Sequence, residues 1–162
     1  MHDAVDAVVE AEQGHRFEDV YREHGARLCR SVLLYTGDLE IARDAVAEAF
    51  AQGIRRGEQV GSPLAWITRT AYRIAAGEMK RRRRTDYPIV ERPYEMPEPA
   101  LELVSALASL SPNQRRAVIL HFYDGYSKAE TAEIIGSTPS AVGVHLNRAR
   151  KRLRDLLGDE DA

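Results

Sequence analysis

Residues 126–153 read YSKAETAEIIGSTPSAVGVHLNRARKRL, and this stretch limits the folds open to the chain. Apolar residues recur at helical spacing on both sides of residues 136–139, which predicts helices at about 127–135 and 140–157. Three positions have the offsets of a helix-turn-helix: Ala132, Gly136 and Val142. The small alanine lets the helices approach, the glycine permits the tight turn, and the valine closes the core between them.

The second helix of this motif is expected to present its outward side chains to the major groove of DNA. Ser140, near its start, is expected to cap it. The side chains expected to face base edges are Ser140, Ala141, Val144, His145 and Arg148. The bases expected to reach phosphates are Arg150, Lys151, Arg152 and Arg154. The alternative is an ordinary helical hairpin with a basic end.

The composition favours helices, and basic and acidic residues are concentrated in different parts of the chain. The chain has 162 residues, and with only 7% aromatic residues any core depends on Ala, Leu, Val and Ile. The formal net charge is −2, yet residues 69–84 hold seven bases against Glu78, and residues 140–154 hold five bases and no acid. These two blocks indicate either two contacts with a polyanion or two solvated helix faces.

Prolines divide the chain. Four of the seven fall within residues 85–99, where they disfavour helix and predict an extended, stiff linker. We therefore expect an all-α protein of two small helical domains, residues 1–84 and 100–162, the second containing the helix-turn-helix. No alternating strand pattern is present in either half.

Three helices are expected before the linker. The first runs from Phe17 to about Thr36, and Asp38 is a candidate N-cap for the second. The inward face of the second comprises Leu39, Ala42, Val46, Ala49 and Phe50. A glycine-bearing loop follows, and Ser62-Pro63 opens a long third helix through Arg84.

The third helix carries a basic stripe with one aromatic residue. Trp66, Arg69, Arg73, Lys80 and Arg84 cluster roughly opposite its apolar side. Such a stripe suits a nucleic-acid strand, with cations at phosphates and the ring on a base. Alternatively, Trp66 packs against a neighbouring helix and the bases are solvated, with residues 81–84 complementing the helix dipole.

Several classes of function find no support. The lone cysteine, Cys29, excludes an internal disulfide, and with His24 it makes no known metal spacing. The sequence has no phosphate-binding glycine loop and no nucleophile motif, so neither an enzyme nor a cofactor or metal site is expected. No signal peptide and no apolar run long enough to span a bilayer is found, and a cytoplasmic protein without membrane insertion is expected.

The chain from Phe17 to Leu157 resembles a bacterial sigma factor of the extracytoplasmic-function (ECF) type. DAVAEAF (44–50) resembles the family's polymerase-binding helix, SPLAWITRTAYRIAAGEMKRRRR (62–84) its following DNA-facing helix, and residues 109–154 its −35 domain. The resemblance implies that core RNA polymerase, promoter DNA and an anti-sigma factor are partners. It implies promoter-specific initiation through the −10 and −35 elements, with catalysis left to the polymerase.

Position by position, the resemblance implies three sets of contacts. Asp44 and Glu48, on one helix face, would meet the clamp helices of the polymerase β′ subunit, although they also suit ordinary surface charge. Residues 52–62 would capture a flipped −10 base, unless they are only a flexible connector. The −10 contacts would be Arg55, Arg56, Trp66, Arg69, Arg73, Lys80 and Arg81. The −35 contacts would be Ser140, Ala141, Val144, His145, Arg148, Lys151 and Arg152.

The chain departs from the family at five interface positions, where polar residues are usual: Ala47, Arg73, Gly77, Ala141 and Gly143. The family commonly has Gln, Asn, Asp, Thr and Lys there, respectively. These departures leave two alternatives open: a sigma-like decoy that occupies an anti-sigma factor or the polymerase, and a simple helix-turn-helix regulator.

Overall fold

The computed structural model describes residues 2–85 and 97–158, with side chains from residue 16 onward except that of residue 58. Every regular element in these ranges is helical, so the all-α prediction is confirmed. The elements are α1 (His2–Thr36), α2 (Leu39–Arg56), η1 (Gly57–Gln59), α3 (Pro63–Arg84), α4 (Glu98–Ala108), α5 (Pro112–Val118), η2 (Ile119–Tyr123), α6 (Lys128–Ile135) and α7 (Pro139–Leu157).

The chain forms two compact units. The first unit comprises Met1–Val32 and Glu40–Tyr87, and the second comprises Leu33–Leu39 and Pro88–Ala162. The predicted linker falls mostly at residues 86–96, outside the described residues. Helix α4 begins at Glu98, two residues before the expected start of the second domain.

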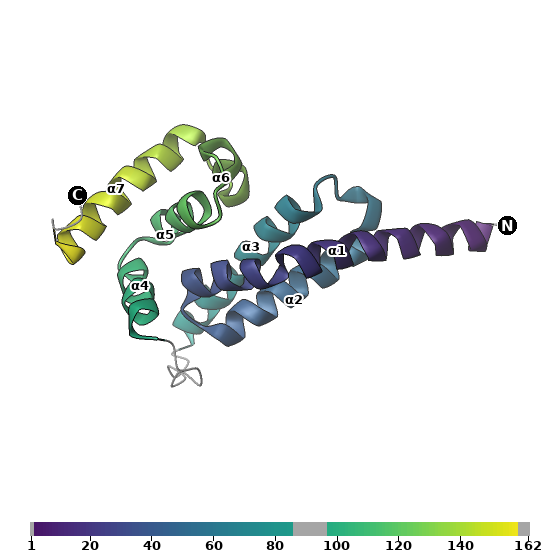
Figure 1. Cartoon of the computed structure of the whole chain (residues 1–162), viewed down its shortest axis with the longest axis horizontal. Helices are drawn as coiled ribbons and strands as arrows, with labels where there is room; N and C mark the ends of the chain where they lie inside the picture. Colours follow the sequence, from purple (N-terminus) through teal and green to yellow (C-terminus); the bar gives the residue numbers. More distant parts are fainter. Residues whose placement is uncertain (1, 86–96, 159–162) are drawn as a thin grey trace. The chain divides into compact units, whose positions relative to one another are not determined.

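In the first unit, α1, α2 and α3 run alongside one another (Figure 1). Their shared core is built mainly from small and branched side chains, as the low aromatic content requires. Three larger rings complete it, those of Phe17, Phe50 and Tyr72. Phe17 is 1% exposed, and Tyr72 is 1% exposed with its hydroxyl 2.6 Å from Ser31 Oγ. The remaining buried residues include Leu28, Val32, Ala42, Val46, Ala49, Ile67, Ala71 and Ala75.

The loop expected after the second helix begins later than predicted. Helix α2 continues to Arg56, so most of residues 52–62 is helical rather than open. Gly53 was expected in this loop, but it is a buried helical position where an added Cβ would lie 2.7 Å from the Phe17 ring. The glycine allows α1 to approach α2, so its role is in packing and not in a loop.

In the second unit, α5 and α6 pack against α7 (Figure 1). Side-chain capping boxes begin both shorter helices: Ser111 with Gln114 at α5, and Ser127 with Glu130 at α6. The core of this unit contains Ala117, Ala132, Val142 and Leu146. The helix-turn-helix prediction is confirmed, including the roles of the alanine and the valine.

In the turn between α6 and α7, a glycine ends the first helix and a threonine caps the second. Gly136 has φ +70°, a left-handed conformation that favours glycine and ends α6. The predicted cap of the next helix was wrong by two residues: Thr138 is the N-cap, and its hydroxyl accepts a hydrogen bond from the Ala141 amide at 3.1 Å. Ser140 lies inside the first turn of α7, because Pro139 occupies the first helical position.

Candidate nucleic-acid interface

Helix α7 turns one side to the core and the opposite side to solvent. Val142, Leu146 and Ala149 are buried. The seven residues predicted to contact the −35 element lie away from this buried line: Ser140, Val144, Arg148, Lys151 and Arg152 are exposed, and Ala141 and His145 are half-buried. The structure therefore brings all seven together on the accessible surface of one helix.

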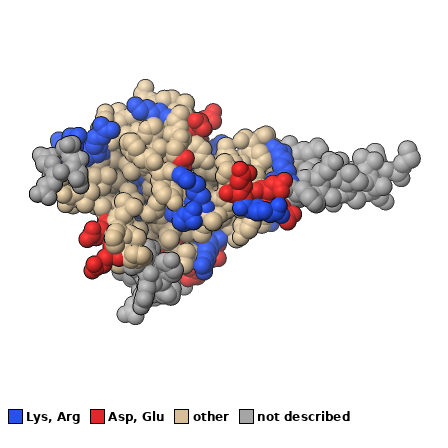
Figure 2. All heavy atoms as spheres, in the orientation of Figure 1, with Lys and Arg blue, Asp and Glu red and all other residues tan. Residues whose placement is uncertain are grey.

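The charge on this surface is of one sign through most of α7. Residues 140–154 carry five exposed bases and no acid. Figure 2 shows basic side chains over the exposed part of α7, near the C-terminal end of the helix. Such a helix attracts phosphate groups and favours a polyanionic partner.

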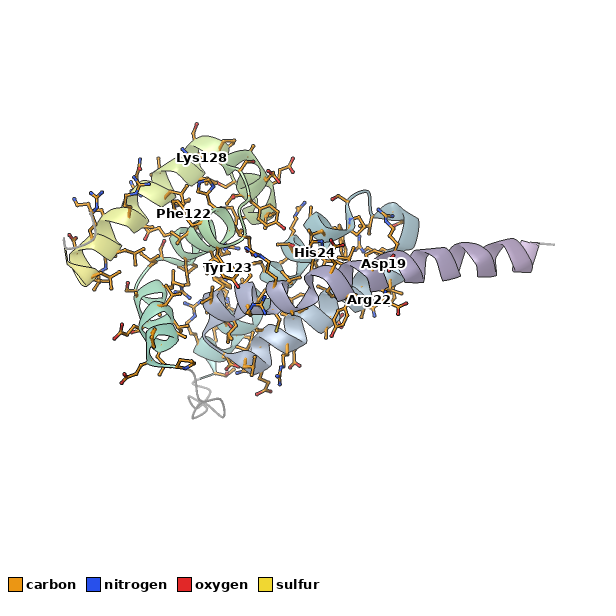
Figure 3. The ribbon with its side chains drawn as sticks, viewed as in Figure 1. Asp19, Arg22, His24, Phe122, Tyr123 and Lys128 are labelled. Atoms are coloured by element: carbon orange, nitrogen blue, oxygen red, sulfur yellow. The ribbon has the colours of Figure 1, made fainter. Side chains whose placement is uncertain are left out.

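The bases of α7 divide between two sides of the helix. Arg150 and Arg154 line a groove of about 420 Å³ together with apolar side chains from η2 and α7, including Phe122 and Leu157. Phe122, labelled in Figure 3, is 60% exposed. These two arginines, expected from the sequence to reach phosphates, thus lie around the helix from Arg148 and Lys151.

One polar residue on the surface predicted to face DNA was not identified from the sequence. Asn147 is exposed and lies three residues after Val144 and next to Arg148. An asparagine side chain can pair with the adenine edge in the major groove. Its position on the helical wheel was the signal that could have identified it.

On α3, the predicted stripe is accessible. Arg69, Arg73 and Lys80 are exposed, whereas Trp66 is half-buried. The Arg56 guanidinium carbon lies 5.7 Å from the centroid of the Trp66 ring. The indole therefore has a cation over one face, an arrangement intermediate between the stacking and packing interpretations.

The basic end of α3 contains an internal acid partner. Glu78 accepts hydrogen bonds from Arg81 at 2.6 and 3.0 Å and from Arg82 at 3.1 Å. The Arg81 hydrogen bonds, with the Arg82 bond and both guanidinium charges, hold the pKa of Glu78 at about 2 against the opposing effect of desolvation. The Arg82 side chain is only 17% exposed and also lies 3.9 Å from Glu40. The run at residues 81–84 is therefore less available to a polyanion than its sequence indicates.

On α2, the structure connects two residues for which different roles were predicted. Asp44 and Glu48 are both exposed, while Val46, Ala49 and Phe50 are buried. The Glu48 carboxylate accepts hydrogen bonds from Gln52 Nε2 at 3.0 Å and Arg55 Nη2 at 3.2 Å. The Gln52 and then the Arg55 hydrogen bond lower the pKa of Glu48. Glu48, a predicted polymerase contact, is thus paired with Arg55, a predicted −10 contact.

Other kinds of site find no support in the described residues. There, no three His, Cys, Asp or Glu side chains are grouped as a metal site, and no helix has the length and hydropathy to cross a membrane. Cys29 is half-buried, and burial raises the pKa of its thiol despite the nearby Arg43 and Arg30. This thiol is not activated as a nucleophile.

Known proteins are similar to the chain in sequence and in fold. Residues 100–153 match the family "Sigma-70, region 4". The ECF RNA polymerase sigma factor SigM of Mycobacterium tuberculosis is 29% identical, over 89% of this chain and 78% of that protein. RNA polymerase sigma factor CarQ of Myxococcus xanthus is 26% identical, over 88% of this chain and 90% of that protein.

Together, these matches support an ECF sigma factor.

Solved structures agree with this fold. The sigma factor RpoE of Bartonella quintana, in complex with the anti-sigma factor NepR, superposes with a TM-score of 0.72 at 22% identity, covering 90% of this chain and 98% of that chain. CnrH, in complex with the cytosolic domain of CnrY, superposes with a TM-score of 0.72 at 21% identity, covering 96% of this chain and 97% of that chain. The match to the family "Sigma-70, region 4" runs from the first turn of α4 through most of α7, and thus includes every predicted −35 contact.

Proposed function

We propose that this sigma factor binds core RNA polymerase through α2 and contacts the −10 element with its first unit and the −35 element with its second. Sigma factors are regulatory subunits that direct transcription initiation and leave catalysis to the polymerase. The observation that carries the proposal is the accessible surface of α7 over residues 140–154, which hold five exposed bases and no acid, in a helix-turn-helix that matches sigma-70 region 4. This function also requires a cytoplasmic location.

The second unit supplies a major-groove reader. Helix α7 lies in the groove, with Ser140, Ala141, Val144, His145 and Arg148 toward base edges, and Lys151 and Arg152 toward phosphates. Phosphate neutralisation supplies affinity, and base-edge contacts supply sequence preference. The buried Val142 and the Thr138 cap fix the angle at which α7 leaves the turn, which supports a rigid presentation of these side chains.

The first unit supplies the polymerase contact and the −10 contact. Asp44 and Glu48 face the β′ clamp helices, and their exposure on one face of α2 supports this. The −10 element is contacted by Arg55, Arg56, Trp66, Arg69, Arg73, Lys80 and Arg81. Capture of a flipped base at residues 52–62 would cost a few kcal/mol, which backbone neutralisation would offset.

A sigma-like decoy is the second candidate, and the five departures from the family favour it. Side chains at Ala47, Gly77 and Gly143 are small or absent, and no atom lies within 4 Å of a Cβ added at either glycine. A side chain could therefore stand at either glycine without a change in packing. A decoy would bind an anti-sigma factor or the polymerase but would not initiate. The solved complex of RpoE with the anti-sigma factor NepR supports an anti-sigma partner for either candidate.

In-vitro transcription separates these candidates. Core polymerase and fragmented genomic DNA from the source bacterium are incubated with and without the protein, and new 5′ ends are sequenced. We expect new starts that share two spaced upstream motifs. Binding to core polymerase without new starts would establish the decoy. Duplex binding without polymerase binding would establish a simple regulator.

A further inference from the structure

Val144 is an exposed apolar residue at the centre of the DNA-facing surface. The Val144 side chain is 45% exposed, whereas Val142, Leu146 and Ala149, which form the core side of α7, are buried. At 100° per residue, Val144 points almost directly away from that core line. A β-branched residue here lies outside the core and is a poorer helix former than alanine. Its apolar surface is therefore available to a partner.

The residues around Val144 indicate what kind of chemical group such a partner presents. Ala141 lies one turn before it and adds a second apolar side chain. Gly143, its neighbour in sequence, has no side chain to cover it. Asn147 and Arg148 lie one turn after it, both exposed. A small apolar patch thus adjoins two side chains that pair with purine edges.

In the major groove of unmodified DNA, only thymine presents an apolar group, its C5 methyl. We infer that Val144, assisted by Ala141, is a specificity-determining residue that contacts a thymine methyl group. The inference rests on the proposed placement of α7 in the major groove. It adds the base, and the atom on that base, that the surface selects.

The test compares thymine with deoxyuridine, which pairs identically but lacks the methyl group. The full-length protein selects duplexes from a library with a randomised centre, and the enriched motif is determined. Each thymine of that motif is then replaced singly by deoxyuridine, and affinities are measured by fluorescence anisotropy at constant salt. We expect one position, or two adjacent ones, at which the replacement weakens binding about fourfold, the value of one buried methyl group.

Two variants assign the effect to its residue. Val144→Ala is expected to reduce the thymine-to-deoxyuridine ratio at that position to about one, because the contacting methyl groups are gone. Leu103→Ala removes a similarly exposed apolar side chain from α4, 48% exposed, and is expected to retain the ratio. Val144 faces solvent and alanine favours helix, so both variants should fold.

Three results would overturn the inference: no enriched motif, a motif indifferent to deoxyuridine at every thymine, or a ratio unchanged in Val144→Ala. None requires polymerase, so they are separate from failure of the proposed function. A methyl-dependent motif in a protein that produces no new transcripts would leave the base contact established and the sigma activity refuted.

Discussion

The hydroxyl of Tyr72 on α3 lies 2.6 Å from Ser31 Oγ on α1, in the core of the first unit. Both side chains are almost completely buried. A buried hydrogen bond of this kind favours one register of the two packed helices. A shift in register would break the bond between two polar groups that have no access to water. It thereby also positions the exposed arginines of α3.

Tyr72→Phe is expected to lower the free energy of unfolding of the first unit by about 1 kcal/mol. The chain has a single tryptophan, Trp66, and it lies in this unit, so urea unfolding followed by its fluorescence reports on this unit. Ser31→Ala and the double variant complete a thermodynamic cycle. Additive effects of the two substitutions would show that the pair is not coupled.

The stability contributed by Glu78 is expected to depend on pH. Its folded-state pKa of about 2 lies below the ordinary 4.5, so its contribution is complete above pH 4.5 and is lost as the pH falls toward 2. Glu78→Gln should destabilise the first unit at neutral pH by less than about 1 kcal/mol, since the pairs are partly exposed. The difference from the parent should shrink in acid.

Urea unfolding at neutral and acid pH, followed by Trp66 fluorescence, measures this difference. Glu23→Gln on α1 removes a charge from the same unit without touching the arginine pairs, and it serves as the control. A difference between parent and Glu78→Gln that is equally large at both pH values would contradict the assigned pKa.

Charge reversal on α2 tests the proposed polymerase contact. Asp44→Lys with Glu48→Lys should weaken binding to core polymerase by about tenfold or more, because like charges would then meet across the interface. Affinity for −35 duplex should change less than twofold. Asp44→Lys alone is informative, because it leaves the Glu48 pair with Arg55 intact.

The matched control for this reversal is Asp19→Lys with Glu23→Lys, two exposed acids with the same spacing on α1. Figure 3 shows Asp19 and Arg22 on α1. Asp19 Oδ1 lies 3.6 Å from Arg22 Nη1. Polymerase affinity is measured by fluorescence titration with labelled protein. Equal losses in both double variants would indicate general electrostatics rather than a contact at α2.

Removing two bases from α7 should change the salt dependence of DNA binding. Arg148→Gln with Lys151→Gln should weaken −35 duplex binding and reduce the slope of log K against log salt by roughly 2. Arg83→Gln with Arg84→Gln on α3 makes the same charge change in the first unit and should leave this slope unaltered. An unaltered slope in the α7 variant would mean that this helix does not lie on DNA.

Sequence reasoning succeeded where one local pattern dominated. The helix-turn-helix required a small residue, a left-handed glycine and a core valine at fixed offsets, and all three are where their spacing predicts. It failed at Gly53 and Ser140. Gly53 is required by the approach of Phe17 from another helix. Thr138 and Ser140, two positions apart, are both residue types that can cap a helix.

The candidate site was predictable as a surface but not as a set of contacts. Exposure of Asp44, Glu48 and the α7 residues follows from helical periodicity. The Glu78 pairs with Arg81 and Arg82 and the Glu48 pair with Arg55 depend on rotamers and on side-chain reach. A count of bases therefore overstated the charge that α3 offers to a polyanion.

Gly143 offers a test in the direction of gained function. It lies within α7, a Cβ there would meet no atom within 4 Å, and the family commonly has lysine at this position. Gly143→Lys should fold, and it should gain helix stability of up to about 1 kcal/mol. If the added ammonium reaches a phosphate, the salt slope of −35 duplex binding should steepen by about 0.9.

Gly143→Ala separates the two effects, because it gains the helix propensity without the charge. Affinity and slope are measured for both variants on the same duplex, and helix stability by hydrogen exchange of α7 amides. A steeper slope in Gly143→Lys alone would place this position beside the DNA backbone and identify its glycine as a lost contact. Equal slopes in the two variants would put residue 143 away from the phosphates, and the departure from the family would then have no bearing on duplex affinity.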